Sequence, residues 1–250
     1  MKLFIPALSL VLFSSFVWLE ARKPKVWLIG DSTCANKEIK AYPETGWGMP
    51  FAYFFDSTIE VDNRAKNGRS TRTFISEKLW QAVADNLQAG DYVFIQFGHN
   101  DESKEKVDRY TSPEDYKANL AIFVNQSKAK GANPVLLTPV SRRKFDDAGK
   151  AIETHQVYSR VVRELATEMN VPLIDLDIES QQLYQQFGVE NSKLLFLQLA
   201  PGEHPNYPEG KMDNTHFNEL GARKIAQLIL ANIKTLHLGL AEHIVKPKVK

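Results

Sequence analysis

Ser32 has the residue type and the position of an enzyme nucleophile. It follows Gly30 and Asp31 at the end of an apolar run, residues 26–29, whose bulky side chains are typical of a buried parallel strand. A glycine after such a run predicts a tight turn that presents the Ser32 hydroxyl. A serine hydroxyl is a weak nucleophile until a neighbouring base removes its proton. The hypothesis therefore requires a base, and a pocket for the developing oxyanion, elsewhere in the chain.

His216 has the residue type of the missing base, and Asp213 has that of the carboxylate that would orient it. We expect them at the start of a helix or in a tight turn, where a spacing of three residues places both side chains on one face. The carboxylate would then accept the proton of one imidazole nitrogen and leave the other nitrogen to accept the Ser32 proton. Two other interpretations are a metal site, although no second His or Cys stands nearby at ligand spacing, and a helix cap beside a surface histidine.

Three hydrogen-bond donors could hold the oxyanion. Gly68 can bring a backbone N–H close to a ligand, Asn100 can offer a side-chain amide, and the Ser32 backbone N–H lies at the predicted turn. Each residue also has an ordinary structural explanation, because Gly68 can be a turn glycine and Asn100 can bond its own backbone. These donors, together with Asp213 and His216, complete the set that Ser32 needs.

The pattern along the chain predicts an α/β fold. Strand-like apolar runs alternate with segments of helical spacing, which indicates a parallel sheet covered by helices on both faces. Ligands of such sheets bind at the carboxyl ends of the strands, where the loops of Ser32, Gly68 and Asn100 begin. The expected strands are residues 26–29, 59–61, 92–97, 134–137 and 173–176, and the expected helices are residues 73–87, 113–129, 154–169 and 218–236. Residues 197–214 show no regular pattern.

Length and N-terminal composition predict one exported domain. Residues 3–19 are apolar and follow a lysine, so we expect residues 1–21 to be a secretion signal or an uncleaved anchor, and residues 22–250 to be a single domain. Membrane contact is expected only if the segment stays uncleaved. The formal charge of +1 gives no global attraction to nucleic acid, so no such partner is expected. We expect a secreted or periplasmic monomer.

Cys34 is the single cysteine of the chain, which excludes an intrachain disulfide. Its ordinary interpretation is a small buried hydrophobe. Its position two residues after Ser32 raises the alternative of a reactive thiol, but one base can serve only one of the two side chains.

The motifs together resemble the SGNH (GDSL) hydrolase superfamily. The shared blocks are Gly-Asp-Ser at residues 30–32, the glycine at position 68, Gly-His-Asn-Asp at residues 98–101 and Asp-x-x-His at residues 213–216, in the order of the superfamily. Longer runs at residues 30–35, 46–48, 67–74, 97–101 and 213–217 resemble the rhamnogalacturonan acetylesterases more narrowly. The chain departs from some fungal relatives in lacking the cysteines for their disulfides.

The resemblance implies a three-layer α/β/α sandwich with a flavodoxin-like five-stranded parallel sheet. It implies hydrolysis of acetyl esters on pectic polysaccharide without a metal or other cofactor. The catalytic roles fall on Ser32, Asp213 and His216, and the oxyanion roles on Ser32, Gly68 and Asn100. His99, beside Asn100, is expected to be structural.

The expected substrate is a polyanion, so cationic side chains in the loops around the site would favour its binding. We expect substrate contacts from Asp31, Trp47, Arg69, Arg72, Arg142 and Arg143, with Trp47 and Tyr42 able to stack on sugar rings. The alternatives are a related esterase for another acetylated glycan or small acyl ester, and a non-catalytic pectin-binding module. A lipid substrate is disfavoured because these loops are rich in Arg, Asn and Ser rather than apolar residues.

Overall fold

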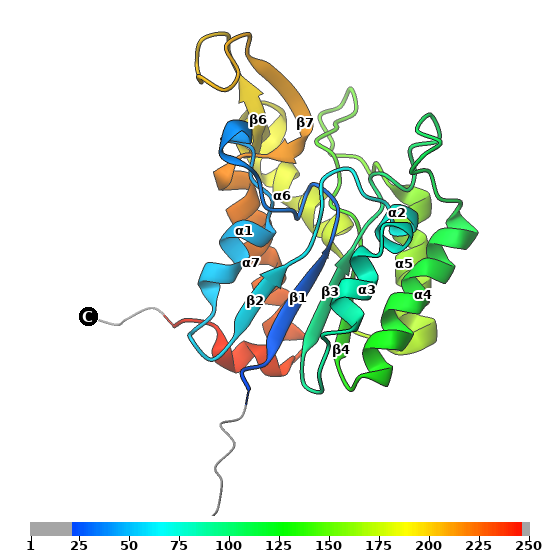
Figure 1. Ribbon diagram of the computed structural model, residues 1–250. Coiled ribbons are helices and arrows are strands. Elements are labelled where there is room, and N and C mark those ends of the chain that lie inside the picture. The colour runs from blue at the N-terminus through cyan, green and yellow to red at the C-terminus, as the bar shows by residue number, and fades with distance from the viewer. Residues whose placement is uncertain (1–21, 247–250) are drawn as a thin grey trace, which may run out of the picture.

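A five-stranded parallel sheet forms the middle layer of the molecule (Figure 1). The computed structural model describes residues 22–246, so the expected signal or anchor at residues 1–21 lies outside the described residues. The strand order is β2-β1-β3-β4-β5, which confirms the predicted flavodoxin-like sheet and puts the switch in strand order between β1 and β3. The strands are β1 (Lys25–Gly30), β2 (Glu60–Asn63), β3 (Tyr92–Gln96), β4 (Asn133–Leu137) and β5 (Leu173–Ile174).

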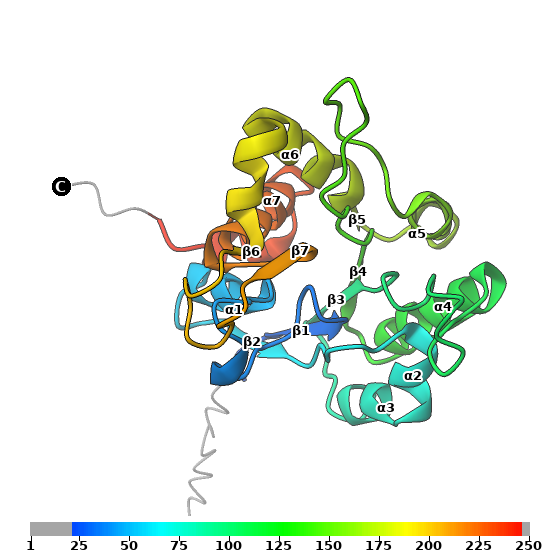
Figure 2. The same ribbon diagram turned by 90° about the horizontal axis from the view of Figure 1, so that it is seen from above.

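Helices cover both faces of the sheet, which confirms the three-layer sandwich (Figures 1 and 2). One face carries α2 (Thr71–Ser76), α3 (Leu79–Ala84), α4 (Pro113–Ala129) and α5 (Gln156–Met169), and the other carries α1 (Gly48–Phe51), α6 (Leu176–Asn191) and α7 (Glu219–Thr235). Short 3-10 helices span Ile39–Ala41, Ala52–Phe54, Ser192–Leu195 and Gly239–His243. Within residues 22–246, no helix has the length and apolar character needed to span a bilayer.

Alternation along β1 builds two separate cores. Val26 and Leu28 belong to the apolar cluster on the α7 side, whereas Trp27 and Ile29 belong to the cluster on the α4 side. Side chains of a strand point alternately to the two faces of its sheet, so a central strand must be apolar at every position. Because β1 is buried on both faces, its end, and with it Ser32, is held in a defined place at the carboxyl end of the parallel strands.

Several sequence-based boundaries are wrong. The helix expected over residues 73–87 is divided into α2 and α3 because Lys78 adopts a left-handed φ of 59°. Helix α6 was not predicted, since it starts directly after the two-residue strand β5 with no intervening turn and carries many polar residues. By contrast, α4 has the predicted bounds, and α7 begins where Asn218 accepts a hydrogen bond from the Gly221 N–H.

An antiparallel hairpin replaces the irregular stretch expected over residues 197–214. Its strands are β6 (Phe196–Leu199) and β7 (Lys211–Phe217), and it stands at the end of the sheet toward which the parallel strands run (Figure 1). The hairpin loop is tied to the segment after β1, because Asn206 donates to the carbonyls of Ile39 and Tyr42 at 2.9 Å each. The hairpin therefore joins the carboxyl edge of the sheet although it belongs to a separate sheet.

Close backbone packing explains the glycine pair in the segment after Ser32. A Cβ atom on Gly46 would lie 2.1 Å from the Ala35 carbonyl oxygen, and one on Gly48 would lie 2.6 Å from the Cys34 carbonyl oxygen. Real Cβ atoms do not approach so closely, so both positions require glycine. The two glycines let this segment pack directly on the backbone that follows the Ser32 turn.

Candidate active site

Ser32 and His216 meet across the carboxyl edge of the sheet. Ser32 follows β1 directly, and its Oγ lies 2.9 Å from His216 Nε2 in a contact that spans 184 residues. The other ring nitrogen, His216 Nδ1, lies 2.8 Å from Asp213 Oδ2. The three side chains form a continuous hydrogen-bonded line from hydroxyl to imidazole to carboxylate. This is the arrangement in which an imidazole can accept a serine proton.

Asp213 and His216 lie in strand β7, so the expected helix start or tight turn is wrong. In a regular strand, residues three apart point to opposite faces. Here the pairing moves from Phe196 opposite Phe217 to Gln198 opposite Met212, so four residues of β7 face one residue of β6. Asp213 Oδ1 accepts from the N–H groups of Thr215 and His216 at 2.7 and 3.0 Å, which curls the bulge and turns both side chains together.

The environment keeps the Asp213 carboxylate ionised. Its burial alone would raise the pKa, but the hydrogen bond from the His216 ring, the imidazole charge and the two backbone N–H donors lower it, so the pKa lies well below its usual range. The side chain of Asp213 is 17% exposed and that of His216 is 28% exposed. The imidazole can therefore reach solvent and substrate while its carboxylate partner stays largely covered. Asp213 and His216 bond each other, and within residues 22–246 no three His, Cys, Asp or Glu side chains gather as a metal site.

The loops of Gly68 and Asn100 are joined to one another. Gly68 has a φ of 75°, a conformation that favours glycine. Asn100 is 8% exposed, and its Nδ2 donates to the carbonyl of Arg69, the residue after Gly68, at 3.0 Å. The neighbouring Asp101 Oδ1 accepts from both the N–H and the Oγ1 of Thr71, at 2.9 and 2.6 Å. Burial raises the pKa of Asp101 to about 7, and these bonds lower it only in part.

Arg109 also belongs to this part of the site and was missed from the sequence. Its Nη1 donates to Asn100 Oδ1 at 3.3 Å, and it would lie 3.2 Å from a Cβ atom on Gly68. Because Arg109 can only donate, the Asn100 atom that it contacts is the amide oxygen, and the N–H₂ group is the end that faces the Arg69 carbonyl. Arg109 lies between β3 and α4 in the chain, outside every recognised motif, and no spacing signal could have identified it.

Asp31 and Trp47 are buried, so the expectation that they contact substrate is wrong. Asp31 is fully buried, and its Oδ1 accepts from the Thr33 N–H at 2.9 Å and the Thr33 hydroxyl at 2.7 Å, which closes the turn. Trp47 is 1% exposed, and its indole N–H donates to Gln96 Oε1 at 2.7 Å. Gln96 in turn donates to Thr33 Oγ1 at 3.1 Å. The buried side chains of Asp31 and Trp47 therefore stabilise the Ser32 turn through hydrogen bonds on its buried side.

The four predicted arginines all bind protein groups. Arg142 donates to Thr215 Oγ1 at 2.6 Å, and Arg143 to Asn214 Oδ1 at 3.0 Å, so both hold the β7 bulge. Arg69 pairs with Glu77, and Arg72 donates to the carbonyls of Val107 and Tyr110. The structure therefore brings Arg142 and Arg143 to the segment of His216, while Arg69 lies beside Gly68.

Cys34 and His99 lie near Ser32 in the sequence or the site motifs, but both side chains are buried. Cys34 is buried, and its pKa is raised well above the usual value by burial and by the nearby Asp31, so the thiol stays protonated. His99 is 5% exposed and packs edge-on against His155 with ring centroids 4.2 Å apart. Burial, followed by the charge of His155, holds the pKa of His99 well below its usual value. Neither environment suits a nucleophile or a base.

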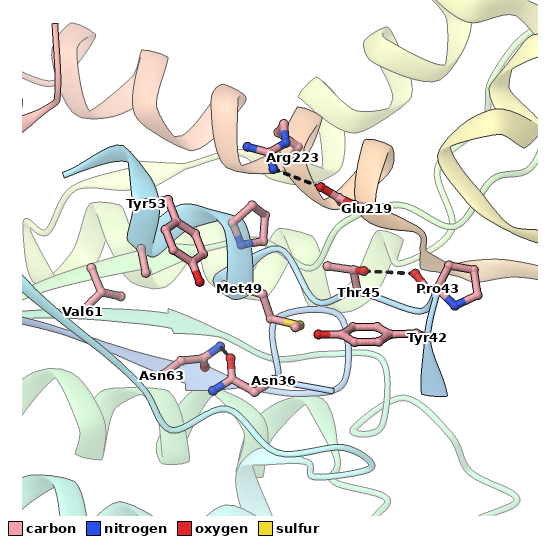
Figure 3. A pocket seen from close by; sticks show the side chains of 13 residues that line it. Asn36, Tyr42, Pro43, Thr45, Met49, Tyr53, Val61, Asn63, Glu219 and Arg223 are labelled. Atoms are coloured by element: carbon pink, nitrogen blue, oxygen red, sulfur yellow. Dashed lines mark hydrogen bonds and ion pairs between the residues drawn. The ribbon is translucent and has the colours of Figure 1, made fainter. Parts of the chain in front are cut away.

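A groove of about 640 Å³ lies between the start of α7, the α1 region and β2 (Figure 3). Tyr42, Met49 and Tyr53 line it, and the ion pair between Glu219 and Arg223 stands on its α7 side. Ser32, Asp213 and His216 are not among its lining residues. Tyr42 is 38% exposed and lines this groove, so the one predicted stacking ring that is open to solvent belongs there.

Comparison with known proteins identifies relatives over most of the chain. Residues 28–224 match the model of the GDSL-like Lipase/Acylhydrolase family. The chain is 41% identical to the rhamnogalacturonan acetylesterase RhgT of Bacillus subtilis over 230 residues, which cover 92% of this chain and 98% of RhgT. It is 36% identical to the probable rhamnogalacturonan acetylesterase YesY of the same organism, covering 89% of this chain and 98% of YesY. The solved structure of Bacillus subtilis YxiM superposes with a TM-score of 0.75 at 26% identity, covering 87% of this chain and 58% of YxiM.

Replacing Trp47 with phenylalanine tests whether this residue supports the turn or binds sugar. Trp47→Phe keeps a ring but leaves Gln96 Oε1 without its indole donor, so we expect the free energy of unfolding to fall by about 1–3 kcal/mol. The KM for an acetylated polysaccharide should stay within about twofold, since a residue that is 1% exposed cannot stack on a sugar. Urea denaturation and acetate-release kinetics measure the two quantities.

Trp80→Phe is a control for the loss of an indole donor, because Trp80 also donates its indole N–H to a glutamine, Gln126 Oε1 at 2.7 Å, on the α4 side of the sheet. Gln126 is exposed, so water can replace the lost donor, and Trp80→Phe should lose less stability than Trp47→Phe, where Gln96 is fully buried. A large rise in KM confined to Trp47→Phe would contradict the supporting role.

Proposed function

The chain belongs to the GDSL-like lipase/acylhydrolase family, and we propose that it is a carbohydrate esterase that removes acetyl groups from rhamnogalacturonan-type pectin. The observation that carries the proposal is the hydrogen-bonded line Ser32–His216–Asp213, with contacts of 2.9 and 2.8 Å. The identity of 41% over nearly the full length of a rhamnogalacturonan acetylesterase supports the choice of substrate.

In the proposed reaction Ser32 attacks the acetyl carbonyl while His216 Nε2 accepts the hydroxyl proton. Asp213 stabilises the imidazolium that results. The carbonyl electrons move onto the oxygen, and the N–H groups of Ser32 and Gly68 and the Asn100 amide hold this oxyanion. The sugar oxygen leaves with the proton from His216 and an acetyl-serine remains. Water then attacks the acetyl-serine, His216 accepts a water proton, and acetate leaves as the proton returns to Ser32.

The arginines of these loops are the reason for proposing a polyanionic substrate, and two of them, Arg69 and Arg142, also form ion pairs with Glu77 and Glu102. Arg69, Arg72, Arg142 and Arg143 each use only some of their guanidinium donors on protein groups, so we keep them as proposed contacts to substrate carboxylates. These cations are already ordered by the protein, which lowers the entropy cost of binding. An esterase for another acetylated glycan or small acyl ester is the alternative, since the same acyl-transfer groups would serve it.

We also propose that the protein acts as a monomer outside the cytoplasm, without nucleic acid or cofactor. The apolar N-terminal segment at residues 3–19 is the reason for expecting export. Mass spectrometry of the full-length expressed chain recovered from periplasm or medium should find a new N-terminus near Arg22. Protein that keeps Met1 and stays with the membrane fraction would instead show an uncleaved anchor.

Ser32→Ala removes the nucleophile, so acetate release should fall by at least about 10⁴-fold. We expect the wild type to release acetate faster from acetylated rhamnogalacturonan than from acetylated xylan at equal acetyl content. An enzymatic acetate assay measures both polymers, with Ser32→Ala as the blank. Residual activity of Ser32→Ala at the wild-type rate would exclude the serine mechanism. Faster release from xylan would favour the alternative substrate. Binding to pectin without Ser32-dependent acetate release would favour the non-catalytic module.

The activity should fall at acid pH, because the proposed reaction needs a neutral base. His216 must be neutral to accept the serine proton, whereas the lowered pKa of Asp213 keeps that carboxylate charged until the solution is strongly acidic. We therefore expect kcat/KM for p-nitrophenyl acetate to decrease by at least about tenfold per pH unit on the acid side. A profile that is flat down to pH 4 would contradict this assignment.

A further inference from the structure

Lys37 is a buried cation with no part in the reaction described above. Its side chain is 1% exposed, although it lies in the segment between Ser32 and Trp47 and is only five residues from the nucleophile. Burying an ammonium group costs several kcal/mol unless acceptors replace its water. A cation at such a place needs a full set of partners.

Three oxygen atoms surround the Lys37 ammonium. Its Nζ donates to the Ser32 carbonyl at 2.6 Å and to Asn67 Oδ1 at 2.8 Å, and it pairs with Glu44 Oε1 at 2.6 Å. An ammonium group has three N–H donors, so each donor has one acceptor. The Glu44 side chain is 18% exposed and balances the charge.

The partners belong to two different loops of the site. Ser32 follows β1, whereas Asn67 follows β2 and is bonded directly to Gly68, the residue whose N–H we assign to the oxyanion. The ammonium therefore joins the backbone of the nucleophile to the residue before the oxyanion glycine. A second bond between these loops runs from the Lys66 N–H to the carbonyl of Gly30, two residues before Ser32, at 3.0 Å.

We propose that Lys37 is a positioning residue that holds the N–H groups of Ser32 and Gly68 at the spacing needed to bind one oxyanion. Fixing the Ser32 carbonyl orients the residue whose hydroxyl attacks, and fixing Asn67 places the glycine beside it. The inference rests on the proposed function. Because Lys37 does not touch the substrate, its loss should act on the transition state and not on ground-state binding.

The test compares steady-state kinetics of p-nitrophenyl acetate hydrolysis in variants of the full chain, with Ser32→Ala as the blank. We expect Lys37→Met to lower kcat about 100-fold and to leave KM within about threefold, as for a displaced oxyanion donor. Asn67→Ala removes the same bridge from the other end and should lower kcat about tenfold. The double variant should be no slower than Lys37→Met, because both substitutions break one bridge.

Lys40→Met is the matched control, since Lys40 lies in the same segment and makes an ion pair with Glu38, but its side chain is 83% exposed. It should keep the wild-type kcat. If Lys37→Met does not fold, the Asn67→Ala variant alone tests the proposal, since Asn67 is exposed and its substitution should not prevent folding. A wild-type kcat for Asn67→Ala would then overturn the proposal. A folded Lys37→Met with wild-type kcat, a loss confined to KM, or additive losses in the double variant would also overturn it.

The experiment separates this inference from the function on which it rests. A wild-type protein without Ser32-dependent hydrolysis would overturn both. Normal Ser32-dependent hydrolysis in the wild type, with the same kcat in Lys37→Met, would overturn the positioning role alone.

Discussion

The contact between Ser32 Oγ and His216 Nε2 is the constraint on which the site depends, because a hydroxyl can pass its proton only to a base within hydrogen-bond distance. The two residues come from different sheets. Ser32 is held by β1, which is buried on both faces, and His216 by a hairpin that stands at the carboxyl end of the parallel strands. Packing of the core fixes one partner, and the seating of the hairpin fixes the other.

Polar groups buried behind the nucleophile keep this contact in place. Asp31 closes the turn on Thr33, Thr33 bonds Gln96, and Gln96 accepts from Trp47, so the turn is linked to β3 and to the segment that packs over it. Buried polar atoms without partners are costly, which makes each member of such a network dependent on the others. The motif aspartate and the tryptophan between two glycines are thus needed for the shape of the turn.

Alternation of strand-like and helical segments predicted the layered parallel sheet, and the chemistry of the loop residues predicted the residues at the strand ends, because both are local signals. The flavodoxin-like strand order was implied by the resemblance to the SGNH hydrolases. It failed where structure depends on distant contacts. Helix α6 has a largely polar sequence, the hairpin pairs across an eleven-residue loop, and Lys78 interrupts a segment of helical spacing. Arg109 and Lys37 could not be predicted, because their roles depend on contacts with residues of other loops. The spacing of residues along the chain does not indicate such contacts.

The Asp213–His216 pair shows why a functional motif can be recognised from the sequence although the secondary structure predicted for it is wrong. A spacing of three residues suits one face of a helix, and a regular strand would separate the two side chains. The structure meets the same chemical need with a bulge, in which the Asp213 carboxylate binds the backbone N–H groups of Thr215 and His216 and the imidazole at once. One carboxylate therefore shapes the backbone, orients the ring and stabilises its charge. Because all three tasks require an acceptor within reach of residue 216, the spacing predicts the chemistry whichever element carries it.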